Sequence, residues 1–122
     1  MTAYTAPLDD LRFVLFDVLG ADQILHGLRG GEEHTRGIFD AVLEGAAQLS
    51  EQVLAPTNAP ADAEGCHFDP QTHTVTTPRG FKHAFAQFAE GGWTSLTNPE
   101  RYGGQALPLV LGIATTEIFQ SG

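Results

Sequence analysis

The sequence predicts an all-α domain, a small up-and-down helical bundle with long loops, and two observations carry that expectation. Apolar residues recur at helical spacing in three separate stretches, 38–53, 81–89 and 109–118. Glycine and proline gather between these stretches, which favours loops there. An apolar fraction of 42% over 122 residues suits one domain with a modest core.

The chain is expected to begin with a loose arm and a short helix. Apolar residues recur at helical spacing after Asp9 and Asp10, either of which can cap the helix start. Gly20 is a suitable stop for this helix. Residues 21–28 are ambiguous, with room for one more turn that Asp22 could cap.

The longest predicted helix runs from about residue 32 to residue 54. Its apolar face is small between Gly45 and Ala47, so another helix can approach closely there. Pro56 is expected to end this helix, because proline removes a backbone donor and its ring clashes with the preceding turn. Residues 56–72 are rich in Pro, Asp, Gly and Asn and are interpreted as a long surface loop.

Three elements are expected in the second half of the chain. Residues 73–77 carry β-branched side chains, but the run is short, so we expect a single short strand or an extended segment. The apolar stripe over 81–89 predicts a helix with Phe85 and Phe88 in the core. A last helix is expected from about 107 to 120.

The stretch from Gly91 to Pro108 predicts an ordered loop between the last two helices. It contains two Gly-Gly pairs, each of which permits a sharp change of chain direction. Trp93, Leu96 and Tyr102 are expected to anchor it. The second pair, Gly103–Gly104, precedes a helix and could orient backbone donors toward an anion, but turn geometry is its simpler use.

The charge balance excludes some classes of function. Acids outnumber bases 15 to 6, and a net charge of −9 argues against binding nucleic acid, which needs clustered Lys and Arg. The single cysteine, Cys66, cannot form an internal disulfide and favours a reducing compartment. No apolar stretch is long enough to span a bilayer, so we expect a cytoplasmic protein without membrane contact.

Few residues are candidates for chemistry. His67, Asp69 and His73 lie close in sequence, but their spacing matches no closed zinc site, so no metal site is expected. Cys66 has no base nearby in the sequence and is not expected to be a nucleophile. Glu117 falls on the apolar face of the last helix, which is unfavourable without a partner. It lies at the rim, pairs with an arginine, or has a function, and these readings stay open.

Several strings together resemble one family. Gly92-Trp93, a spacer, and then Pro-Glu-Arg-Tyr-Gly-Gly-Gln-Ala-Leu-Pro, ending at Pro108, resemble the N-terminal domain of acyl-CoA dehydrogenases. Ala106 stands where that family usually has glycine. Residues 4–15 and 76–85 resemble a longer-chain branch of the family, which includes enzymes acting on methylthio-propanoyl-CoA.

The resemblance implies a division of the chain and an activity. Residues 1–30 correspond to an N-terminal extension with a short helix, and residues 31–122 to the N-terminal helical domain. The family dehydrogenates acyl-CoA thioesters at the α,β-bond, with FAD accepting the hydride and an electron-transfer acceptor reoxidising it. The resemblance implies that the family's flavin-binding domains and catalytic base lie outside these 122 residues, so the isolated chain is expected to be inactive and to bind no FAD. The full-length enzyme is expected to be a homo-oligomer.

The resemblance also implies which residues approach the substrate. Three residues, Tyr102, Gly103 and Gly104, would shape the loop near the acyl pocket. Three more, Ile113, Thr116 and Glu117, would touch the acyl tail.

The last helix suggests a second class of function. It is apolar over much of its circumference, and 122 residues provide few helices to cover it, so an exposed apolar patch is expected. Such a patch is also what a stand-alone helical interaction module would use to bind a partner.

Overall fold

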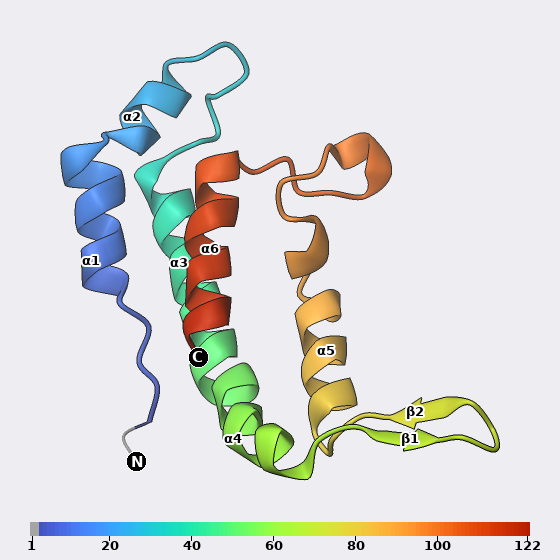
Figure 1. The fold of residues 1–122 in the computed structure, drawn as a ribbon. Coiled ribbons are helices and arrows are strands. Elements are labelled where there is room, and N and C mark those ends of the chain that lie inside the picture. The colour runs from blue at the N-terminus through green and yellow to red at the C-terminus, as the bar shows by residue number, and fades with distance from the viewer. Residues whose placement is uncertain (1–2) are drawn as a thin grey trace.

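The computed structural model describes residues 3–122, and its main helices alternate in direction. They are α1 (Leu8–Arg12), which continues into the π-helical η1 (Phe13–Val18), α3 (Arg36–Leu49), α5 (Phe81–Glu90) and α6 (Leu109–Ser121). In Figure 1, α1 and α5 run one way, and α3 and α6 run the other way side by side. The predicted all-α, up-and-down fold is confirmed.

The first helix starts without the predicted side-chain cap. Its N-cap is Pro7, and Asp9 and Asp10 lie in the first turn, where acids favour the positive end of the helix dipole. Gly20 ends the helix as predicted, with a φ of 58°. The ambiguous stretch that follows is the short helix α2 (Ala21–His26), which Gly20 rather than Asp22 caps.

The long central helix starts later than predicted and does not end at Pro56. The Thr35 side chain accepts a hydrogen bond from the Ile38 amide at 3.3 Å and so caps α3. After α3 the chain continues through the π-helical η2 (Ser50–Leu54) into α4 (Ala55–Glu64). The predicted loop over residues 56–72 is therefore wrong for its first half.

Proline is tolerated here because of where it falls. Pro56 is the second residue of α4 and directly follows the π-helical η2, where the regular α-helical hydrogen-bond ladder is already interrupted. Pro56 and Pro60 are both exposed, so their rings meet solvent rather than a packed neighbour. The Thr57 hydroxyl donates to the Leu54 carbonyl oxygen at 2.7 Å and so satisfies an acceptor at the junction.

The predicted lone strand belongs to a small antiparallel hairpin. β1 (His67–Asp69) pairs with β2 (Thr74–Thr76), so that Phe68 lies opposite Val75. The Asp69 carboxylate accepts hydrogen bonds from the amides of Gln71 at 2.8 Å and Thr72 at 3.4 Å, which closes the turn. The sequence prediction missed β1, which is recognised as a strand only through its pairing with β2. The hairpin projects away from the helices (Figure 1).

The core lies where α1 and α6 pack on α3. Among the residues described, Phe39, Leu43, Leu111 and Ile118 are fully buried. At the small residues of α3 the predicted neighbour was another helix, but Gly45 meets the Trp93 ring of the loop before α6, which would lie 3.4 Å from a Cβ at this position. Leu11, Leu15 and Phe16 join the same cluster, so the N-terminal helix shares this core.

The α5 stripe is only partly covered. Ala84 is buried, but Phe85 is 64% exposed, so its predicted place in the core is wrong. Phe88 is half-buried and its ring meets Phe119 edge-on, with centroids 5.1 Å apart. No helix in the described range, 3–122, is long and apolar enough to cross a membrane.

Candidate functional site: two apolar hollows beside α6

The Gly-rich stretch before α6 is an ordered loop. It forms two short 3-10 turns, η3 (Trp93–Ser95) and η4 (Glu100–Tyr102). The Leu107 amide donates to the Leu96 carbonyl oxygen at 3.0 Å. The Gln105 side chain donates to the Gly92 carbonyl oxygen at 3.1 Å. These bonds hold the two arms of the loop together against the start of α6.

Glycine is required at the sharpest point of this loop. Gly103 has a φ of 81°, which L side chains rarely adopt. A Cβ on Gly104 would lie 2.0 Å from the Asn98 carbonyl oxygen, which no side chain can do. The Gly103–Gly104 pair is therefore explained by turn geometry.

A hollow of about 320 Å³ lies between η3 and α6, and we call it the loop-side hollow. Its wall includes an aromatic cluster, in which the Phe119 ring meets Trp93 edge-on at a centroid distance of 5.3 Å. The lining consists of Phe88, Trp93, Thr94, Leu96, Thr97, Leu109, Gly112, Ile113, Thr115, Thr116 and Phe119.

The structure divides the six sequence-predicted site residues into two groups. Ile113 and Thr116 line the loop-side hollow, and the Thr116 hydroxyl donates to the Gly112 carbonyl oxygen at 2.8 Å. Glu117, one residue further along α6, does not line it.

The other residues lie away from this hollow. Tyr102 is 74% exposed, with the Arg101 guanidinium 4.9 Å from its ring centroid, so it does not anchor the loop in the core as predicted. Tyr102, Gly103 and Gly104 are absent from the lining of the hollow.

Glu117 does not face the core. It is exposed, and no ion pair to it is present among the described residues. Of the readings that the sequence left open, the structure favours the rim, where water solvates the carboxylate without cost.

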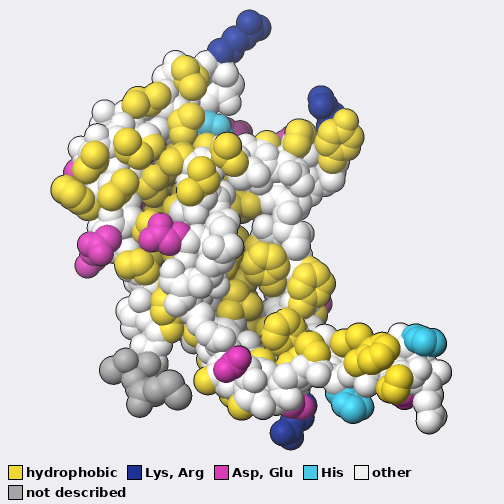
Figure 2. Space-filling view, in the orientation of Figure 1, with side chains coloured by type: hydrophobic (Ala, Val, Ile, Leu, Met, Phe, Trp, Pro, Cys, Tyr) yellow, Lys and Arg dark blue, Asp and Glu magenta, His cyan; other side chains and the backbone are white. Residues whose placement is uncertain are grey.

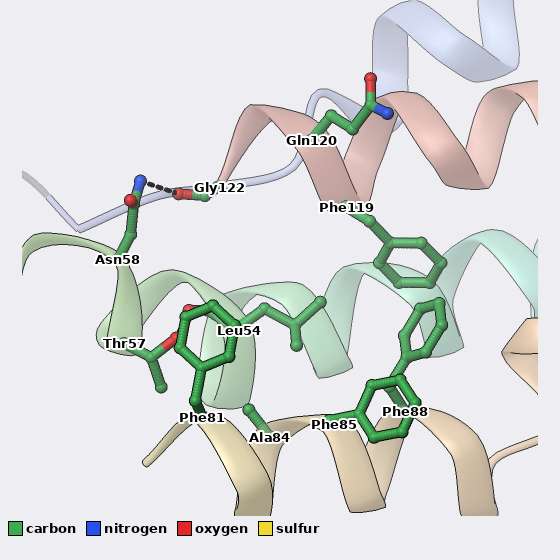
Figure 3. Close-up of a pocket in the computed structure, with 10 residues that line it drawn as sticks. All are labelled: Leu54, Thr57, Asn58, Phe81, Ala84, Phe85, Phe88, Phe119, Gln120 and Gly122. Carbon is green, nitrogen blue, oxygen red and sulfur yellow. Dashed lines mark hydrogen bonds between the residues drawn. The ribbon is translucent and has the colours of Figure 1, made fainter. Parts of the chain in front are cut away.

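A second hollow, of about 360 Å³, lies between α4, α5 and the end of α6, and we call it the α5-side hollow. Figure 3 shows the rings of Phe81, Phe85 and Phe88 along α5, with Phe119 facing them from α6. At one end, the Asn58 side-chain amide donates to the Gly122 carbonyl oxygen at 3.0 Å. Phe88 and Phe119 line both hollows and form the wall between them.

Sequence reasoning missed the aromatic wall and Gly112. Phe119 lies on the last helix but belongs to no predicted stripe, so only the packing shows its role. Gly112 did carry a signal, because an isolated glycine within a helix often marks a close approach. A Cβ there would lie 2.7 Å from Cγ2 of Thr97, so the loop packs directly on α6 at this point.

The chemistry of both hollows is that of a binding surface. None of the residues lining them has a charged side chain, so they offer a neutral, apolar ligand a place but supply no acid or base. Within residues 3–122 no group of three His, Cys, Asp or Glu side chains lies close enough to hold a metal ion.

The buried polar side chains of the described residues are satisfied within the chain. No buried side-chain nitrogen or oxygen among these residues lacks a hydrogen-bond partner.

Together, the fold and the site define a helical domain that offers apolar binding surface beside its last helix. No family model matches the chain. It is 33% identical, over 97% of its length, to the 3-methylmercaptopropionyl-CoA dehydrogenase of Ruegeria pomeroyi. It is 31% identical, over 88% of its length, to the broad-specificity linear acyl-CoA dehydrogenase FadE5 of Mycobacterium tuberculosis. The resemblance to acyl-CoA dehydrogenases predicted from the sequence is confirmed.

The similarity covers only part of these relatives. The chain spans 20% of the length of the Ruegeria protein and 18% of the length of FadE5. The 122 residues thus correspond to one region of much longer dehydrogenases.

Proposed function

We propose that the chain is the N-terminal helical portion of a flavin-dependent acyl-CoA dehydrogenase. In this proposal, residues 1–30 are its extension and residues 31–122 its helical domain. The observation that carries the proposal is the 33% identity to a named acyl-CoA dehydrogenase along nearly the whole chain. The apolar hollows beside α6 support it, because an acyl tail needs a neutral, apolar surface.

The proposed contribution of this chain is to bind the acyl tail. Ile113 and Thr116 line the loop-side hollow and would contact the tail there. Glu117 would lie at the rim of the same helix, in solvent. Tyr102, Gly103 and Gly104 would act indirectly, by giving the loop the shape that packs on α6. None of these groups is proposed to be catalytic.

The cofactor and the partners belong to the full-length enzyme in this proposal. FAD would supply the hydride acceptor there, held by domains outside these 122 residues. The substrate would be an acyl-CoA, and a separate electron acceptor would reoxidise the enzyme. We propose a cytoplasmic homo-oligomer that contacts neither nucleic acid nor membrane. The isolated chain would be colourless and inactive.

A second candidate is a stand-alone helical interaction module. The exposed apolar side chains of α6 favour it, because Leu109 is 69% and Ile113 62% exposed. In a module these side chains would bind a partner protein, whereas in a dehydrogenase the acyl tail and neighbouring domains would cover them.

The two candidates are separated by the reading frame that follows Gly122 and by activity. The longest polypeptide that contains this chain should be expressed, and acyl-CoA oxidation measured with an artificial electron acceptor. We expect a yellow protein that oxidises acyl-CoA and a colourless, inactive 122-residue chain. A frame that stops shortly after Gly122, or a longer protein without acyl-CoA oxidation, would overturn the proposal.

A matched pair of variants tests the role of the loop-side hollow. Ile113→Glu places a charge in the hollow, and Val75→Glu places the same charge on the hairpin at nearly equal exposure, 62% against 61%. We expect Ile113→Glu to raise the KM for acyl-CoA about tenfold or more, since a bound apolar tail would cover the new charge and remove it from water. Val75→Glu should leave KM unchanged. Equal effects of both would contradict the proposed tail site.

A further inference from the structure

The N-terminal helix is apolar on two sides, but the fold uses only one of them. Seven of the nine residues from Leu11 to Leu19 are apolar. Leu11, Leu15 and Phe16 point into the core beside α3. The remaining apolar side chains of this run are exposed, which a helix on the surface of a finished assembly rarely shows.

The exposed side chains continue from the first helix onto α2, and we call this surface the outer face. Each member is between 46% and 60% exposed. The members are Phe13, Val14, Val18, Leu19, Ile24 and Leu28. Figure 2 shows hydrophobic side chains gathered over the region of α1 and α2. A set of large apolar side chains this close together indicates an interaction surface.

Acids outnumber bases around the outer face, although the exposed Arg29 follows Leu28 and the Arg36 guanidinium lies 4.3 Å from the Phe16 ring centroid. Asp9, Asp10 and Asp17 are exposed on the same helix. The one base of that helix, Arg12, is directed to α3, where its guanidinium donates to Asp40 and Glu44, each at 2.8 Å. The Arg12 guanidinium also lies 3.9 Å from the Asp9 carboxylate, so Asp10 and Asp17 are the acids of this helix that have no ion pair among the described residues.

This charge pattern decides which occupant suits the outer face. A second copy of the chain would place Asp10 and Asp17 against the same acids, and each copy carries a net charge of −9. An anionic lipid surface would be repelled for the same reason. A helix with an apolar stripe and lysine or arginine on its flanks would cover the apolar side chains and neutralise the acids.

We propose that the outer face binds a basic amphipathic helix of another protein. The exposed side chains of the outer face supply the apolar contact, and Asp10 and Asp17 select the positive flanks. This surface lies on α1 and α2, apart from the hollows beside α6, and the proposal does not depend on dehydrogenase activity.

Two synthetic helical peptides test the proposal, one of leucine and lysine and one of leucine and glutamate. Their binding to the chain is measured by titration calorimetry at physiological ionic strength. We expect the lysine peptide to bind and the glutamate peptide to show no heat. Equal binding of both peptides would overturn the charge selection.

Matched variants locate the binding surface. Val18→Ser, at a position that is 60% exposed, should weaken the affinity for the lysine peptide about tenfold. Val75→Ser, at a position of the hairpin that is 61% exposed, should leave this affinity unchanged. Asp10→Asn with Asp17→Asn should weaken it, whereas Asp62→Asn with Glu90→Gln, two exposed acids elsewhere, should not. Equal losses in both pairs would mean non-specific attraction and would overturn the proposal.

Two further measurements address the other occupants. Sedimentation of the chain alone should show no self-association through the outer face, so Val18→Ser should leave the sedimentation coefficient unchanged. Vesicles with anionic lipid should not pellet the chain. Self-association through Val18, or vesicle binding that Val18→Ser abolishes, would assign the face to a second copy or to lipid and would overturn the proposal.

Discussion

The Tyr4 hydroxyl donates a hydrogen bond to the carbonyl oxygen of Ile118 at 3.0 Å, joining residues 114 positions apart. The buried Ser50 hydroxyl donates to the same oxygen at 3.1 Å. This carbonyl lies in the last turn of α6, where helix carbonyls lack an intrahelical donor. The N-terminal arm and η2 thus complete the end of the last helix.

The shared acceptor predicts that Tyr4 and Ser50 are energetically coupled. Tyr4→Phe and Ser50→Ala should each reduce the free energy of unfolding by about 1 kcal/mol, because each leaves one donor on the oxygen. The double variant should lose more than the sum, since the carbonyl then has no side-chain donor. Urea unfolding of all four proteins measures the coupling, and simple additivity would contradict it.

The burial of the Tyr4 hydroxyl predicts a loss of stability at alkaline pH. Desolvation by burial raises the pKa of Tyr4 above its ordinary value. Because the folded state disfavours the phenolate, this contribution is present below the unfolded pKa and is lost as pH rises through the folded pKa. Ultraviolet titration in a Tyr102→Phe background, which leaves Tyr4 as the one tyrosine, should give a midpoint above that of the urea-unfolded chain. Equal midpoints would disprove the shift.

Arg12 is predicted to stabilise the docking of the first helix in a salt-dependent way. Its hydrogen bond to Asp40 is the main reason that the pKa of Arg12 is raised, and Glu44 adds to it. The pairs are partly exposed, so Arg12→Met should cost only about 1 kcal/mol at low salt. Thermal unfolding at low and high salt checks this. The difference between wild type and variant should shrink at high salt, because ions screen the pairs.

Gly104 is predicted to be far less tolerant of a side chain than its neighbour Gly103. Gly104→Ala sets a Cβ against the Asn98 backbone and should cost about 2 kcal/mol or more, since the loop must open. Gly103→Ala meets no atom within 4 Å and bears only the strain of its positive φ, about 1 kcal/mol. Chemical unfolding of both variants gives the ranking, and the reverse order would refute the described loop geometry.

Two neighbouring positions on α6 are predicted to respond oppositely to a charge. Ile113 is 62% exposed, so Ile113→Asp should change stability by less than about 0.5 kcal/mol and should reduce any self-association through this face. Leu111 is fully buried, and Leu111→Asp should unfold the domain, at a cost of about 3 kcal/mol or more. Circular dichroism melting and sedimentation measure both effects. An unfolded Ile113→Asp variant would mean that this side of α6 is packed.

Much of the fold could be predicted from the sequence, because helical periodicity is a local property. The apolar stripe over 81–89 predicted α5, and the helix predicted over 107–120 corresponds to α6, each to within about two residues. Gly20 ended the first helix for the same kind of reason, since its left-handed φ is a property of the residue itself. The strings that resemble acyl-CoA dehydrogenases were likewise legible without a structure, and the relatives confirm them.

The tertiary structure decided which side of each helix is covered and where the chain continues through a break. Periodicity placed Phe85 in an apolar stripe, yet its side chain is 64% exposed. On α6 the loop packs at Gly112, while Ile113 remains 62% exposed. Pro56 was expected to end a helix, yet a π-helical turn before it and solvent around it let the helix continue. β1 exists only because Thr74–Thr76 pairs with it. Local propensity sets the elements, whereas burial and pairing depend on residues far away in the sequence, which only the folded chain brings together.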